Sequence, residues 1–312
     1  MLIGLFGLAL GLMGPSGETM ALVATAREEL AGPSADFWPG WTEISFGMVL
    51  VGGDDEHLIC DDRAPDGFGP AEVDPVTGCD IRARPRTFPP GLLAAFPAFG
   101  PPAVVVVGEP DQTGLSDAAW SLTLLHEHFH QHQMASTDYF ARVEALDLSG
   151  GDETGMWMLT YAFPYADPQV AALAQAAAAA LADALDTDGE PTAEAARRYL
   201  SARARLAAQV EARDWRYAEF QMWQEGVSRW TEIAAAARSA DPAWREAGEQ
   251  RRREMLEALS DADLAEQQRL VFYALGAAEA ELMERCGLDW RAGYFDQLEL
   301  GPLVAQTLEA CA

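Results

Sequence analysis

The sequence predicts an α+β protein in which a small β-containing N-terminal part is followed by a mostly helical C-terminal part. Two short β-branched or apolar runs, 45–51 and 103–108, lie among Pro- and Gly-rich segments and are typical of strands. After Asp117 the composition changes to alanine-rich segments, which favour helices. With 49% hydrophobic and 22% charged residues, the chain of 312 residues has enough apolar material for a buried core.

The elements between and after these runs follow from local signals. Segment 65–90 is rich in turn residues, so we expect it to form a long and partly irregular loop. Asp117 is expected to cap a helix that runs through Met134. Thr192 is expected to open a long helical stretch that includes Glu225. The other predicted helices are 170–185, 242–259 and 261–286.

We interpret residues 27–312 as a single catalytic domain. Its β-rich lobe is expected to span 27–115 and its helical lobe 116–312, with a cleft between the two. The sequence does not indicate an oligomeric state.

Residues 1–26 are predicted to be a signal peptide, because 2–13 form an apolar run and Ala24-Thr25-Ala26 resembles a cleavage site. Export of the protein, to the periplasm or by secretion, is therefore favoured. A cytoplasmic location stays open, because no basic residue precedes the apolar run and Glu18 follows it. No other stretch approaches the roughly 20 apolar residues of a membrane span.

The net charge of -28 at pH 7 narrows the range of partners. A strongly acidic surface repels phosphate groups, which argues against nucleic acid and anionic membrane surfaces as partners.

The four cysteines, Cys60, Cys79, Cys286 and Cys311, contain no CxxC pair, which excludes a zinc ribbon or a thioredoxin-type motif. The pairings local in sequence, Cys60 with Cys79 and Cys286 with Cys311, are predicted to be disulfides. Four buried thiols are the alternative if the chain stays in a reducing compartment.

Four of the five histidines lie between 126 and 132, in the predicted helical segment LLHEHFHQHQ. Residues four apart on a helix are about 40° apart around its axis, so His126 and His130 can bind one ion. His128 and His132 form a second pair about 200° away. Only the first pair has a Glu directly after its first member, Glu127, and this HExxH spacing is typical of zinc hydrolases. His128 and His132 are expected on the wetter side of the helix.

A zinc ion held by two histidines needs a third protein ligand and keeps one position for water. No histidine follows His132, so a carboxylate must serve, and Glu225 is the best candidate. Gly226 is expected to let its helix approach the histidine helix closely. Arg229 and Glu232 share the face of Glu225 and are expected to orient it or the histidines. The fallback ligands are Glu219, Glu232 and Glu144.

The segments HEHFH and WQEGVSRWTE together resemble the gluzincin branch of zinc metallopeptidases, in which a downstream Glu, often in a Glu-Gly helix, completes the site. The resemblance implies a zincin-like fold with His126, His130 and Glu225 as zinc ligands and Glu127 as general base. The resemblance rests on these two segments, and the chain looks more like an uncharacterised bacterial group of gluzincin-like proteins than like the well-known enzymes of this branch. The Gly-Ala-Met-Glu-Asn motif of aminopeptidase N-like enzymes is missing, so their activity is not expected.

These features predict a zinc-dependent metallohydrolase that acts on a peptide or another amide. A zinc-bound water, activated by Glu127, would attack the amide carbonyl. Tyr273 is the candidate donor to the oxyanion, with Tyr294 and Arg229 next, although an apolar helix around Tyr273 also fits a core tyrosine. Two alternatives remain: an exported zinc-binding or partner-binding protein without catalysis, and a helical interaction protein with surface histidines.

Overall fold

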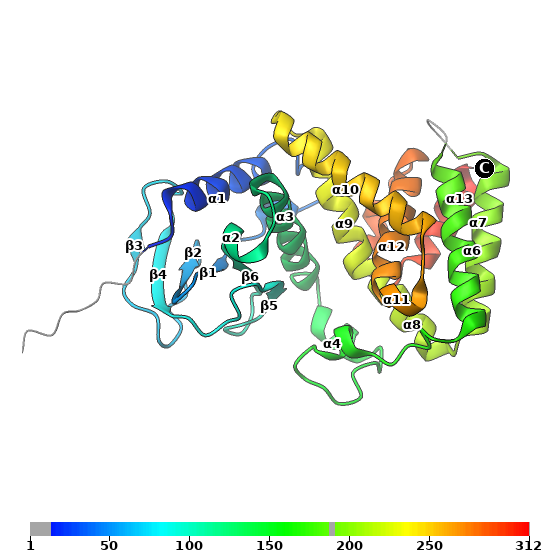
Figure 1. Cartoon of the computed structure of the whole chain (residues 1–312), viewed down its shortest axis with the longest axis horizontal. Helices are drawn as coiled ribbons and strands as arrows, with labels where there is room; N and C mark the ends of the chain where they lie inside the picture. The colour runs from blue at the N-terminus through cyan, green and yellow to red at the C-terminus, as the bar shows by residue number, and fades with distance from the viewer. Residues whose placement is uncertain (1–13, 187–190, 312) are drawn as a thin grey trace, which may run out of the picture.

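The computed structural model describes residues 14–186 and 191–311, and it shows two lobes side by side (Figure 1). The first lobe is built on a six-stranded sheet, and the second is helical. The predicted α+β class and the predicted order of the two parts are therefore confirmed.

The sheet has the order β3-β4-β2-β1-β6-β5. Neighbouring strands are antiparallel except β1 and β6, which are parallel. The two predicted strands correspond to β1 and β6, which are fully buried. Segment 65–90, expected to be partly irregular, contributes two strands, β3 and the longer β4. The strands are β1 Met48–Val51, β2 Asp55–Ile59, β3 Glu72–Val73, β4 Asp80–Pro85, β5 Leu93–Phe96 and β6 Val104–Gly108.

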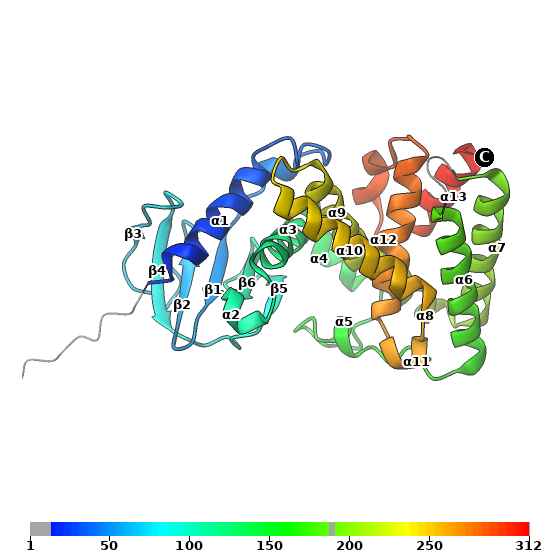
Figure 2. The same ribbon diagram turned by 45° about the horizontal axis from the view of Figure 1, so that its top comes forward.

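The two faces of the sheet bury alternate residues of β1, as the strand period of two requires. Met48 and Leu50 belong to the main core, together with residues of α1 (Gly17–Leu30) and α3 (Asp117–Met134). Figure 2 shows α1 running along the sheet and α3 lying between the sheet and the helical lobe. Val49 and Val51 face the opposite way, into a smaller cluster covered by phenylalanines from the loops.

Helix α3 contacts both lobes. It packs on β5, β6 and α1 on one side and on α9 (Val227–Arg238) and α10 (Pro242–Ser260) on the other. Its N-cap is Ser116, whose hydroxyl accepts a hydrogen bond from the backbone N–H of Ala119, and the predicted cap, Asp117, is the first helical residue. The histidine helix therefore lies at the junction of the two lobes.

The helical lobe differs from the sequence prediction at two breaks. The helix opened by Thr192 ends at Gln209, and a new helix begins at Ala212, so Glu225 does not share it. The predicted helix 261–286 is interrupted at Gln268, whose φ of 51° is incompatible with a continuous helix. The remaining elements are α2 Pro110–Thr113, α4 Tyr139–Glu144, α5 Trp157–Thr160, α6 Pro168–Leu185, α7 Ala193–Gln209, α8 Ala212–Gln221, η2 Met222–Gly226, α11 Leu264–Gln267, α12 Leu270–Arg285, α13 Gly301–Cys311 and the short turns η1 Trp41–Glu43 and η3 Trp290–Asp296.

The N-terminal segment enters the fold as a helix. Ala24-Thr25-Ala26, the expected cleavage site, lies within α1, where Val23 and Ala26 are fully buried in the main core. Residues 2–13, the apolar run of the predicted signal peptide, lie outside the described residues. Cleavage after Ala26 would remove Met20 and Val23 from the core, so a mature chain that begins at 27 would lose part of its packing.

Both predicted disulfides, Cys60–Cys79 and Cys286–Cys311, are present. Disulfides are typical of oxidising, extracytoplasmic environments, in agreement with the predicted export. Among the described residues, no helix has the combined length and apolarity that a membrane crossing needs.

Candidate metal centre

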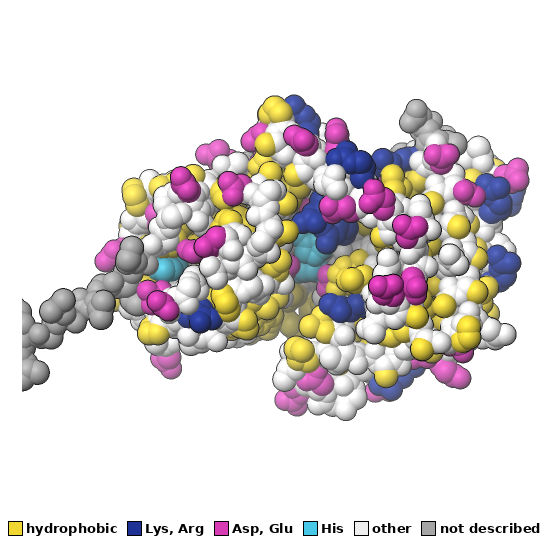
Figure 3. Space-filling model, in the orientation of Figure 1, with side chains coloured by type: hydrophobic (Ala, Val, Ile, Leu, Met, Phe, Trp, Pro, Cys, Tyr) yellow, Lys and Arg dark blue, Asp and Glu magenta, His cyan; other side chains and the backbone are white. Residues whose placement is uncertain are grey.

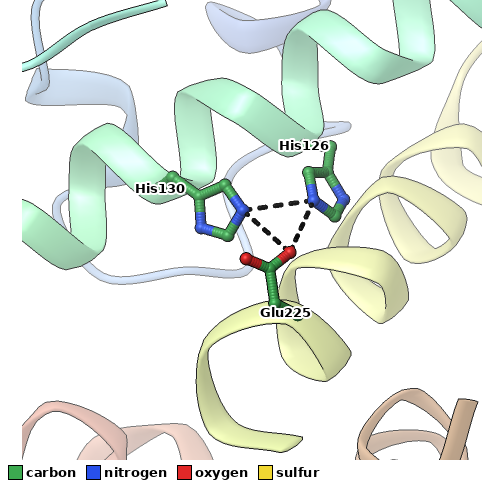
Figure 4. Close-up of side chains that lie close together, drawn as sticks. All are labelled: His126, His130 and Glu225. Atoms are coloured by element: carbon green, nitrogen blue, oxygen red, sulfur yellow. Dashed lines mark hydrogen bonds and ion pairs between the residues drawn. The ribbon is translucent and has the colours of Figure 1, made fainter. Parts of the chain in front are cut away.

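Three side chains converge between α3 and the start of α9 (Figure 4). Nε2 of His126 lies 3.2 Å from Nε2 of His130, and Oε2 of Glu225 lies 3.6 Å and 3.4 Å from these two nitrogens. Ligand atoms about 2.0–2.1 Å from a tetrahedral zinc lie roughly 3.3–3.4 Å apart. The three atoms therefore outline one face of a tetrahedral site. No other three His, Cys, Asp or Glu side chains in 14–186 and 191–311 converge as a candidate metal site.

A turn of π-helix positions Glu225. Residues Met222–Gly226 form η2, between α8 and α9, and such single π turns are frequent at functional sites because they redirect a side chain. Gly226 does not mediate an approach to the histidine helix, contrary to the sequence prediction. A Cβ on Gly226 would lie 2.5 Å from Cα of Gly276, so this glycine allows η2 to contact α12. Helix α12 thereby supports the turn that carries Glu225.

Gln133 fixes the ring of His130. Its Oε1 accepts a hydrogen bond of 2.6 Å from Nδ1 of His130. The amide nitrogen of Gln133 donates to the carbonyl of Gln224 and to the hydroxyl of Tyr294, which sets the orientation of the amide. When the ring is neutral, as metal binding requires, the proton on Nδ1 leaves the lone pair of Nε2 directed toward the other two ligands. The sequence analysis did not identify Gln133, although its spacing of three from His130 places it on the same helix face.

Glu232 lies behind the ring of His126 without a direct hydrogen bond to it. Its Oε2 lies 3.8 Å from Nδ1 of His126, and both atoms are buried without a hydrogen-bond partner among the described residues. Arg229 forms an ion pair with the other oxygen of Glu232, and Arg251 lies 3.8 Å from it. A carboxylate behind a ligating histidine raises its basicity and orients the ring. Arg229 and Glu232 thus lie where the sequence analysis expected them to act.

Glu127 is buried among the same charged groups. Burial raises the pKa of its carboxyl group, Glu225 and Glu232 add to the rise, and His130 and His126 oppose it. Its Oε2 has no hydrogen-bond partner among the described residues. An unpaired buried carboxylate oxygen has a high cost in free energy unless a ligand or water completes it. This orphaned oxygen, next to three converging ligand atoms, fits a site that binds a cation and a water molecule.

In the metal-free site His130 and Glu225 stabilise each other's charge. Burial by itself lowers the pKa of His130, but the Glu225 carboxylate outweighs it, so that the pKa rises to about 9. Burial by itself raises the pKa of Glu225, but the charge on His130 and hydrogen bonds from both histidines hold it well below its usual range. A proton on His130 thus takes the place of part of the positive charge that a cation would supply.

His128 and His132 are not on a wet face, which corrects the sequence prediction. Both are buried, at 1% and 9% exposure. The ring of His128 stacks on Trp41, and that of His132 packs on Phe295. Burial lowers the pKa of each to about 4, so both are neutral core residues at pH 7. Segments distant in sequence cover this face of α3, which the helix pattern cannot reveal.

Two of the three fallback ligands, Glu219 and Glu144, are not among the converging side chains. Glu219 is held by Arg203 and by the backbone N–H groups of residues 300 and 301. Glu144 lies exposed on α4. Tyr294, a reserve oxyanion donor, is buried and donates its hydroxyl to the carbonyl of Trp223, so its role is structural.

Tyr273 lies on α12, three residues before Gly276, where this helix contacts the π turn that carries Glu225. Burial raises the pKa of its hydroxyl, and the charges of Glu225 and Glu127 raise it further. Tyr273 therefore stays protonated and able to donate a hydrogen bond at any physiological pH.

The centre is accessible from solvent. Figure 3 shows histidine atoms at the bottom of a hollow between the two lobes, with arginine side chains beside them. The side chain of Glu225 is 18% exposed, whereas those of His126 and His130 are 8% and 6% exposed. Glu225 is therefore the most solvent-accessible of the three ligands.

Replacing Gln133 with Met is expected to lower the affinity for zinc by about 10- to 100-fold, because Nδ1 of His130 loses the acceptor that fixes its tautomer. Competition with a chelator of known affinity measures this. Gln131 is a matched control: it is equally buried and accepts a 2.7 Å hydrogen bond from Nδ1 of His128 on the other helix face. Gln131→Met should destabilise the fold without changing zinc affinity. Equal zinc affinity in the Gln133→Met variant and the wild type would contradict the assignment.

The structure brings the three predicted ligands together on an α+β framework. A scan against models of known protein families, a search of curated proteins and a search of solved structures each found no match to this chain. A zincin-like fold and membership of the gluzincins therefore stay predictions.

Proposed function

We propose that this protein is a zinc-dependent hydrolase of amide bonds, in which His126, His130 and Glu225 hold the ion. The observation that carries the proposal is the convergence of these three ligand atoms at tetrahedral spacing, with Glu127 unpaired beside them. Two imidazoles and one carboxylate are a donor set that suits zinc and is found in catalytic zinc sites that leave one position open.

When bound, zinc supplies Lewis-acid chemistry: it polarises a carbonyl group and lowers the pKa of a water molecule to about 7. Residues of this chain transfer the proton, stabilise the oxyanion and position the imidazoles. Glu127 takes a proton from the attacking water and delivers it to the leaving nitrogen, for which its raised pKa is suited. Tyr273 donates a hydrogen bond to the oxyanion that forms on the carbonyl oxygen. Gln133 and Glu232 keep the two imidazoles in place.

A peptide library tests the proposed function. Untagged protein loaded with one equivalent of zinc is expected to cleave members of the library, to lose the activity on chelation and to regain it when zinc is restored. A protein that holds zinc only for stability would also melt at a higher temperature with the metal. It would leave every peptide intact, and that result would contradict the hydrolase.

Zinc binding is expected to release about one proton from His130 at pH 7, because its pKa of about 9 keeps it protonated in the metal-free site and zinc requires the neutral ring. The affinity should rise roughly tenfold per pH unit between about pH 6.5 and pH 8.5. Calorimetric titrations in two buffers of different ionisation enthalpy measure the released proton. An affinity independent of pH over this range would contradict the paired charges of His130 and Glu225.

A further inference from the structure

Arg269 lies next to the proposed oxyanion donor. It directly precedes α12, after Gln268 has turned the chain with φ 51° and ψ -127°. Its guanidinium carbon is 5.9 Å from the centre of the Tyr273 ring. Tyr273 in turn responds to the charges of Glu225 and Glu127, while Arg269 opposes their effect on its pKa. Arg269 therefore neighbours a tyrosine whose pKa responds to the carboxylates of the metal centre.

Arg269 is not paired with a carboxylate of the described residues. The chain has 49 acidic and only 21 basic side chains, so an arginine without a partner is unexpected. The other arginines at the centre are paired: Arg229 and Arg251 both contact Glu232. Arg269 forms no ion pair within the described part of the chain, and its buried Nε has no hydrogen-bond partner there. Its guanidinium interacts with the hydroxyl of Tyr273. A guanidinium has five N–H donors, so one contact with a tyrosine leaves donors that can bind a carboxylate through two parallel hydrogen bonds.

We propose that Arg269 binds a free carboxylate of the substrate, so that the enzyme acts on amides one or two residues from a carboxyl terminus. An extended residue spans roughly 3.3–3.6 Å, so the 5.9 Å between the guanidinium carbon and the centre of the Tyr273 ring lies between the spans of one and two residues. A carboxylate held by Arg269 would place the neighbouring amide beside Tyr273 and the centre. This inference rests on the proposed hydrolase function and specifies its substrate class.

Two probes that differ in one group test the inference without turnover. Both are 3-mercaptopropanoyl-alanine, one as the free acid and one as the carboxamide; the thiolate is a ligand for zinc in each. Titration calorimetry with zinc-loaded wild type is expected to show the acid binding roughly 10- to 100-fold more tightly than the amide. Arg269→Gln should abolish this preference and leave the affinity for the amide unchanged, and Arg269→Lys should retain part of it.

Arg205→Gln is the matched control, because it removes the same charge from an exposed position on α7 and should keep the preference. An acid preference that survives Arg269→Gln, or equal affinities of the wild type for acid and amide, would overturn the role of Arg269 and leave the metal centre standing. If neither probe bound the zinc-treated wild type, the metal centre itself would be refuted, and the inference with it.

Discussion

Replacing Glu127 with Gln is expected to abolish amide hydrolysis and leave zinc bound. The amide keeps the size of the side chain but cannot accept the proton of the attacking water. Loss of general acid–base catalysis lowers kcat by about 10²- to 10⁴-fold. The metal should remain, because Glu127 is not one of the three converging ligands. Steady-state rates on a peptide cleaved by the wild type, with metal analysis of the same samples, measure both results.

Two further variants make this result specific. His126→Ala removes a ligand and should lose both zinc and activity. Glu144→Gln changes an exposed carboxylate on α4 and should alter neither. Turnover at the wild-type rate by the Glu127→Gln variant would exclude Glu127 as the general base, and loss of zinc from this variant would make Glu127 a ligand.

Replacing Gly276 with Ala is expected to destabilise the protein by at least about 2 kcal/mol. A Cβ at this position would lie 2.3 Å from the carbonyl oxygen of Met222, and backbone atoms in a packed core cannot move aside cheaply. Met222 begins the π turn that carries Glu225, so the shift needed to relieve the clash should also weaken zinc binding. Urea unfolding and zinc titration measure the two effects.

The sign of this effect is diagnostic, because Gly to Ala within a helix ordinarily stabilises by up to about 1 kcal/mol. Gly17 in α1 provides the comparison, since a Cβ there would meet nothing within 4 Å. Gly17→Ala should therefore be neutral or stabilising. Equal stability of the Gly276→Ala variant and the wild type would contradict the close packing of η2 against α12.

The part of the site that the sequence could predict is local. His126 and His130 share a helix face whatever the helix packs against, because their spacing alone sets the angle between them. Glu225 was identified by a chemical need, the third ligand, and the structure brings it to the two histidines. No signal in the sequence predicts the π turn that orients Glu225. Nor does any signal predict the contact of this turn with Gly276.

The sequence predictions that were wrong concern tertiary packing. The environment of His128 and His132 is set by Trp41 and Phe295, which lie far away in sequence. The helix periodicity alone therefore led to the wrong prediction that the face of His128 and His132 is exposed to solvent. Gly226 was correctly marked as a close contact, but its partner is α12 instead of α3. The sequence prediction missed helix α1, because most of this helix, 17–26, lies within the predicted signal peptide.

Anomalous diffraction at the zinc edge, from crystals of untagged protein grown with one equivalent of zinc, addresses the centre itself. We expect a single peak about 2.0–2.2 Å from Nε2 of His126, Nε2 of His130 and a carboxylate oxygen of Glu225. Absence of a peak, or a peak at His128 and His132 with Glu225 turned away, would contradict the site on which the proposed chemistry depends.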